Sequence, residues 1–183
     1  RYPNTYYAVL ARTRLRQATV ARAVESIEVQ TFLKGIRKPS QPDLDSFEPT
    51  PTTKQRIRRA RVLSAAGLED YAERELRFGA ETDSQPPVIA IELAESASRR
   101  GAPDQAIRYI KRYVPNYLSL PLKAAPQRFW ELAFPLPYRR SLEEYCEQYS
   151  LDPFFVAALI RQESEFNTRA VSYANALGLT QVM

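Results

Sequence analysis

Two segments of the chain match each other: ARVLSAAGLEDYAEREL at residues 60–76 and AESASRRGAPDQAIRYI at residues 94–110. Gly101 stands 34 positions after Gly67, and alanine, serine, aspartate and arginine recur at the same offset. In each copy the glycine separates two helical patterns, and glycine readily adopts the left-handed conformation of a tight turn. The match predicts two helical hairpins, residues 53–66 with 69–80 and residues 87–100 with 103–113.

A helix-turn-helix period of 34 residues is the spacing of tetratricopeptide repeats. Small residues such as Ala60 and Ala94 let paired helices approach closely. Each pair leaves an apolar face that only a neighbouring pair can cover, so such units stack. We therefore expect an all-α fold in which residues 53–135 form a TPR-like helical hairpin superhelix.

The first 52 residues are predicted to contain a separate hairpin and a linker. Asn4 is a candidate N-cap for a helix over residues 5–15, and a second helical pattern covers residues 18–33 before Gly35. Together these give a helical hairpin over residues 1–35. The four prolines that follow predict a Pro-rich linker or long loop over residues 36–52.

Composition excludes several kinds of chemistry. The chain has no histidine and a single cysteine, so Ser-His-Asp triads, His-ligated zinc, Cys-based metal sites and an intrachain disulfide are all ruled out. An enzyme built from this chain must use carboxylates, lysines, hydroxyls or backbone groups. No metal and no cofactor are expected. The net charge of +5 suits an acidic polymer, although an ordinary solvated basic surface is the simpler interpretation.

The ends of the chain carry no targeting signal. No apolar run approaches the roughly 20 residues that cross a membrane, so no transmembrane segment is predicted. The chain opens at Arg1 without a signal peptide and stops at Met183 straight after an apolar run. We therefore expect that both ends have been cut.

The last part of the chain holds one candidate catalytic residue. A short helix is predicted over residues 140–149, and Asp152 followed by Pro153 is a typical start for another. That helix carries Val156, Leu159 and Ile160 in an apolar stripe with Glu163, at i, i+3, i+4 and i+7 spacing. A carboxyl in this line is predicted to be partly desolvated, which favours its protonated form and suits a general acid.

Two simpler interpretations compete with this one. Glu165 is a second carboxylate nearby, but it would lie about 200° around an ideal helix from Glu163, so the two do not face each other. A lone glutamate near a helix end is ordinarily a solvated surface residue.

The context of Glu163 decides in favour of function. The segments ALIRQESEFN (158–167), AVS (170–172) and ALGLTQVM (176–183) together resemble the goose-lysozyme-like catalytic domain of soluble lytic murein transglycosylases, the SLT family. Its Glu-Ser pair and its Gly-Leu-Met-Gln element fall at Glu163-Ser164 and at residues 178–181, with Thr180 in place of the usual Met. Residues 136–183 are therefore expected to be the N-terminal part of a truncated lysozyme-like domain, whose downstream helices are absent.

The resemblance implies non-hydrolytic cleavage of the β-1,4 bond between N-acetylmuramic acid and N-acetylglucosamine. Glu163 would act as the single general acid and base, giving a 1,6-anhydro product. Ser164 would support the helix end and, with Gly178, belongs to the expected substrate site. Sugar contacts are expected from the remaining matched groove positions, Ser172, Gln181 and Met183.

The implied partners are peptidoglycan glycan strands, with other cell-wall proteins reached through the helical repeats. The implied location is the periplasm or cell envelope. An alternative is a helical-repeat protein-binding scaffold with an inactive lysozyme-like remnant. A nucleic-acid binder has only the basic charge in its favour, so no nucleic-acid partner is expected.

Overall fold

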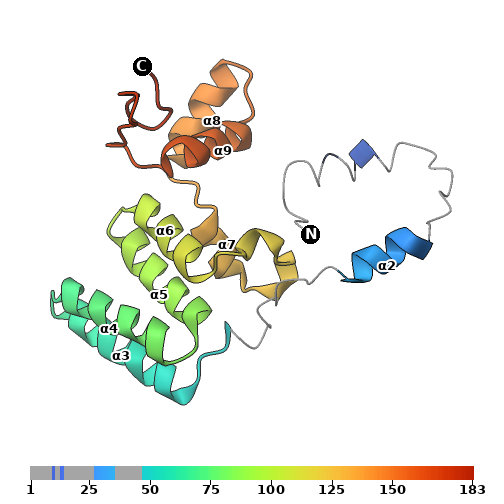
Figure 1. The fold of residues 1–183 in the computed structure, drawn as a ribbon. Coiled ribbons are helices and arrows are strands. Elements are labelled where there is room, and N and C mark those ends of the chain that lie inside the picture. Colours follow the sequence, from blue (N-terminus) through green and yellow to red (C-terminus); the bar gives the residue numbers. More distant parts are fainter. Residues whose placement is uncertain (1–9, 11–12, 15–26, 36–46) are drawn as a thin grey trace.

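A computed structural model describes residues 10, 13–14, 27–35 and 47–183. Within these residues every named element is helical, and extended pairing is limited to two isolated β-bridges near the C-terminus. The all-α prediction is confirmed for the described part of the chain, whereas the tetratricopeptide type of stacking stays a prediction. The elements, in chain order, are α2 (Ile27–Gly35), α3 (Pro51–Ala65), α4 (Glu69–Thr82), α5 (Pro86–Arg99), α6 (Pro103–Tyr113), the 3-10 turns η2 (Tyr117–Ser119) and η3 (Leu122–Ala124), α7 (Gln127–Ala133), α8 (Arg139–Gln148) and α9 (Pro153–Ser164) (Figure 1).

The predictions for the first 52 residues are only partly covered. The Asn4 cap, most of the helix expected over residues 5–15 and the first part of that expected over residues 18–33 lie outside the described residues. Helix α2 ends at Gly35, the glycine expected to close the second helix. Of the predicted linker, residues 36–46 lie outside, and α3 begins at Pro51, two positions earlier than expected.

Both predicted hairpins are present, and their turns have the same hydrogen-bond pattern. Gly67 has φ +75°, and the amide of Leu68 donates to the carbonyl of Leu63 at 2.9 Å. Thirty-four positions later Gly101 has φ +71°, and the amide of Ala102 donates to the carbonyl of Ala97 at 3.0 Å. This is the Schellman arrangement that ends a helix at a left-handed glycine. The match between residues 60–76 and 94–110 therefore corresponds to a turn geometry that occurs twice.

Small residues fill the centre of the helical array, as the match predicted. The alanines that recur between the copies are all buried: Ala60, Ala72, Ala94 and Ala106. One core cluster joins α3, α4 and the start of α5, and a second joins α5, α6 and α7. In the second cluster the Phe129 ring meets Phe47 edge-on, with 5.2 Å between ring centroids. The array is thus closed at its C-terminal side by α7.

A buried ion cluster lies between α3 and α4. The Arg56 side chain, 9% exposed, donates through Nε and Nη2 to both oxygens of Asp83 at 2.7 and 2.9 Å. Its Nη1 donates to Glu75 at 2.9 Å. Gly79 leaves the room that Arg56 needs, because a Cβ there would overlap the arginine side chain. The hydrogen bonds from Arg56 hold the pKa of Asp83 below its ordinary value.

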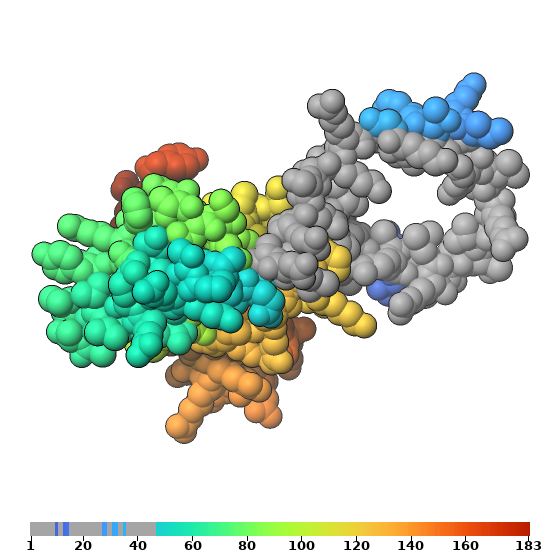
Figure 2. Space-filling view, turned by 90° about the horizontal axis from the view of Figure 1, so that it is seen from below, coloured from blue at the N-terminus to red at the C-terminus, as the bar shows by residue number. Residues whose placement is uncertain are grey.

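The last two helices follow the array as a small separate layer. Helices α8 and α9 lie beyond α6 and α7 in the ribbon view (Figure 1), and the orange residues of α8 project from the array in the space-filling view (Figure 2). A third core cluster contains Leu142, Ala157, Ile160 and Phe166 from this layer and Ile107 from α6. A domain boundary at residue 135 stays a prediction, as do the other predicted boundaries.

Candidate active site

Helix α9 begins as its sequence predicts. The Asp152 carboxylate accepts hydrogen bonds from the amides of Phe154 and Phe155 at 2.8 and 3.3 Å, which satisfies two donors of the first turn. Pro153 occupies the first helical position, where it has no amide to leave unpaired. The helix ends at Ser164, so the Glu163-Ser164 pair lies in its last turn.

Glu163 is exposed, and the prediction that it is shielded from water is wrong for the described residues. The buried face of α9 is centred on Ile160, which is 6% exposed, and includes Ala157. Leu159, expected in the buried stripe, is 44% exposed. Glu163 lies about 60° around the helix from Ile160, at the edge of the face that packs on Leu142. The spacing of the apolar residues correctly predicted a helix, but it predicted a buried face that includes Leu159 and Glu163, whereas the observed buried face is centred on Ile160.

The two neighbouring carboxylates have different surroundings. Glu165 leaves the helix with φ +54°, and its carboxylate forms an ion pair with Lys111 Nζ on α6 at 2.6 Å. Glu163 has no hydrogen-bond or ion-pair partner within the described part of the chain. Glu165 is therefore occupied in a contact with the array, which leaves Glu163 as the carboxylate available to a ligand.

The chain after α9 folds back over the end of that helix. Ser164 Oγ donates to the carbonyl of Leu179 at 2.8 Å, which ties the Glu-Ser pair to the predicted 178–181 element. The amide of Gly178 donates to the carbonyl of Ala170 at 2.9 Å. Gln181 Nε2 donates to the carbonyl of Gly178 at 2.8 Å. The segments singled out in the sequence are thus joined by hydrogen bonds into one loop.

The remaining predicted site residues have structural partners or are open to solvent. Ser172 Oγ accepts from the amides of Ala174 and Ala176 at 3.2 and 3.0 Å. Gly178 has φ +75°, which is reason enough for glycine there, while Met183 is 92% exposed. The sugar-binding roles of Ser164, Ser172, Gly178, Gln181 and Met183 stay predictions.

Comparison with protein families decides what this segment is similar to. Residues 140–183 match the family model of the Transglycosylase SLT domain. The resemblance to the SLT family is confirmed. The matched range, called the SLT segment below, contains the Glu163-Ser164 pair and the whole loop that folds onto it. It indicates lytic transglycosylase or lysozyme-like activity on peptidoglycan, and it covers only the C-terminal minority of the chain.

Two further findings concern residues outside the SLT segment as well. No curated protein matches it. Among the helices formed by the described residues, none has the length and apolar character needed to span a bilayer.

The SLT segment is fastened to the helical array on both sides of Glu163, a feature that the sequence did not reveal. Two residues before it, Arg161 donates through Nε to the carbonyl of Ala133 at 2.9 Å and through Nη2 to the Tyr117 hydroxyl at 2.7 Å. The same guanidinium lies 4.5 Å from the ring centroid of Phe134. Two residues after it, Glu165 forms an ion pair with Lys111. The end of α9 is therefore positioned by the array.

We expect Arg161→Lys to loosen the attachment of α9, because a lysine cannot make both hydrogen bonds and stack on Phe134 at once. The loss should be about 1–2 kcal/mol of local stability. Hydrogen exchange would show faster opening of the α8 and α9 amides with unchanged protection in α5. The control is Arg169→Lys, an exposed arginine of the loop that follows α9, with no ion pair among the described residues. Equal exchange in the two variants would contradict the prediction.

Proposed function

We propose that the protein is a peptidoglycan lytic transglycosylase in which Glu163 is the single general acid and base. The bond to be broken is the β-1,4 linkage between N-acetylmuramic acid and N-acetylglucosamine. The observation that supports this most is the hydrogen bond from Ser164 Oγ to the carbonyl of Leu179, 2.8 Å long. It joins the two SLT motifs at the end of α9, beside a carboxylate that no described residue engages.

The proposed reaction needs only one carboxyl group. Protonated Glu163 gives its proton to the glycosidic oxygen as the bond from that oxygen to the muramoyl C1 breaks. The carboxylate then takes the proton of the muramoyl C6 hydroxyl, whose oxygen bonds to C1 and closes a 1,6-anhydro ring. The glucosaminyl part leaves as an alcohol, Glu163 returns to its starting state, and no water is consumed.

The exposure of Glu163 places a condition on this mechanism. Proton transfer from a carboxylic acid near neutral pH is favoured when water is excluded from the carboxyl group. The described residues leave Glu163 exposed, so under this proposal the bound glycan strand helps to cover the end of α9. Under this proposal Ser172, Gly178, Gln181 and Met183 line the strand, and Thr180 changes one contact relative to the usual Met.

The proposed setting follows from the substrate. A protein that cleaves peptidoglycan works in the periplasm or cell envelope, and its TPR-like array is available to hold other cell-wall proteins. The attachment of α9 to the array through Arg161 and Lys111 supports a role for the array in presenting the catalytic helix.

The products of digestion test the proposal directly. Purified peptidoglycan is incubated with the full protein, and the released muropeptides are analysed by mass spectrometry. We expect 1,6-anhydro ends, each lighter by one water than a hydrolysed end. Hydrolysed ends would assign lysozyme-type hydrolysis instead of transglycosylation.

A protein-binding scaffold with an inactive remnant is the second candidate function. The exposed carboxylate of Glu163 favours it, because an acid without shielding is a weak catalyst at neutral pH. A complete absence of released muropeptides, from a protein whose helices are intact by circular dichroism, would support this alternative.

A further inference from the structure

Helix α3 is the most one-sidedly basic element of the array. Its sequence, PTTKQRIRRARVLSA, holds five cationic residues and no acidic one. Three of the five are neutralised: Arg56 by Asp83, Arg59 by Glu75 and Arg61 by Glu92. Lys54 and Arg58 are exposed and have no ion pair with any described residue. These two charges stand one turn apart on the same face of the helix.

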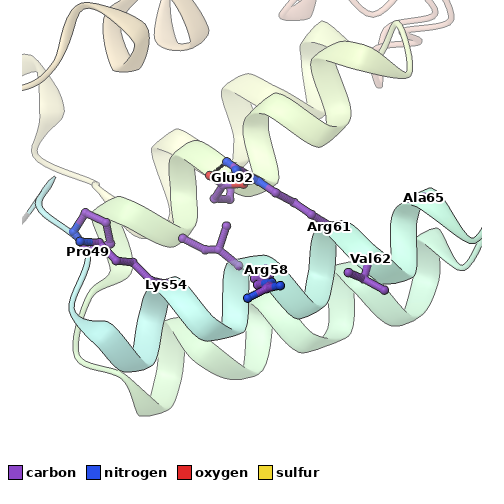
Figure 3. A pocket seen from close by; sticks show the side chains of 8 residues that line it. Pro49, Lys54, Arg58, Arg61, Val62, Ala65 and Glu92 are labelled. Carbon is purple, nitrogen blue, oxygen red and sulfur yellow. Dashed lines mark hydrogen bonds and ion pairs between the residues drawn. The ribbon is translucent and has the colours of Figure 1, made fainter.

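Lys54 and Arg58 line a concave surface. A pocket of about 420 Å³ lies along α3 and opens to solvent; its lining combines the apolar residues Pro49, Ile57, Val62 and Ala65 with the cations Lys54 and Arg58. We call it the α3 groove. Arg61 reaches across from α3 to Glu92 on α5, as the close-up shows, and closes the wall of the groove (Figure 3). Helix α3, drawn in cyan, lies at the surface of the array (Figure 2).

We propose that the α3 groove binds an acidic peptide segment of a partner protein, one that carries carboxylates along the edge of an apolar face. From Lys54 to Ala65 the groove follows the helix for about 16 Å, the length of about three helical turns or five extended residues. Val62 is 63% exposed, so the groove has apolar surface that a bound partner would bury. Carboxylates one turn apart on the partner would match Lys54 and Arg58. This inference does not depend on the proposed catalytic activity.

The groove suits a peptide better than a nucleic acid. A phosphate backbone is bound by many cations along one track, together with aromatic side chains on which bases stack. Among the described residues, the α3 groove offers two cations without an ion pair, has no aromatic residue in its lining, and carries the carboxylate of Glu92 in its wall. An apolar floor with a few charges at its edge is typical of peptide recognition.

Fluorescence anisotropy of a defined probe tests the proposal. The probe is a fluorescein-labelled helical peptide with two glutamates four residues apart beside a leucine face. Its partner peptide has glutamine at both positions. We expect the full protein to bind the acidic peptide at least about tenfold more tightly than the glutamine peptide, because charge complementarity selects between them. Binding of both peptides with equal affinity, or of neither at millimolar concentration, overturns the proposal.

Matched charge reversals locate the binding surface. Lys54→Glu combined with Arg58→Glu is expected to weaken binding of the acidic peptide at least about tenfold. The control combines Arg74→Glu with Lys123→Glu, which changes net charge equally at two exposed cations outside the groove and should stay within about twofold. An equal loss in both double variants overturns the assignment to the groove. Tighter binding of a DNA duplex than of the peptide, lost in Lys54→Glu with Arg58→Glu, would reassign the surface to nucleic acid.

Discussion

Glu163→Gln is expected to lower the rate of muropeptide release from peptidoglycan by at least about 10³-fold, because general acid–base catalysis commonly contributes 10²–10⁴-fold and both proton transfers are assigned to this one group. Glutamine has nearly the same size and shape as glutamate but cannot donate and reclaim a proton. Glu163 has no partner among the described residues, so the change should leave the fold intact. The measurement is the initial rate of soluble product release, resolved by chromatography.

The control is Glu144→Gln on α8, another exposed glutamate of the SLT segment without an ion pair among the described residues. It should retain activity within about twofold, as expected of a surface substitution. Co-sedimentation with insoluble peptidoglycan should be unchanged in Glu163→Gln, because only the chemical step is lost. A Glu163→Gln protein that releases product at the unaltered rate would remove Glu163 from the mechanism.

The local sequence of the hairpins contains most of what determines them. Gly67 and Gly101 could be identified as turn residues because a left-handed conformation is costly for other residues, and both have positive φ. Helices α4 and α6 begin at the predicted residues, Glu69 and Pro103. The buried cluster of Arg56, Glu75 and Asp83 could not be predicted, because it depends on which faces of α3 and α4 meet.

In the candidate site, too, the features set by local sequence could be predicted and those set by packing between helices could not. The start of α9 follows from Asp152 and Pro153, which act within one turn, and its end at Ser164 agrees with the place of the Glu-Ser pair that the resemblance implied. The exposure of Glu163 depends on how α9 is rotated about its own axis where it packs on Leu142 and Ile107. The spacing of apolar residues along a helix predicts that rotation only to within about one residue. The partners of Arg161 come from residues 117 and 133, far away in the sequence, so no local signal marks them.

Arg56→Met is expected to cost about 3 kcal/mol of unfolding free energy, the largest stability change among the proposed substitutions. Methionine keeps much of the side-chain volume but leaves Asp83, whose side chain is 5% exposed, as a charge without its partner. Desolvating an unpaired carboxylate is unfavourable, and the cation–π contact of Arg56 with Phe78 is lost as well. Urea unfolding followed by circular dichroism measures the loss.

Arg59→Met separates burial from charge, because Arg59 binds the same Glu75 at 2.5 Å with a side chain that is 53% exposed. An exposed pair contributes at most about 1 kcal/mol, so a loss equal to that of Arg56→Met would contradict the role given to burial.

The pH dependence of unfolding supplies a second check on the pair of Arg56 with Asp83. Since Arg56 lowers the pKa of Asp83, this stabilisation is complete above the ordinary value of 3.8 and is lost as the pH falls through the lower folded value. The difference between Arg56→Met and the unaltered protein should therefore begin to shrink as the pH falls below about 4, and should disappear as the pH falls through the lowered folded pKa of Asp83.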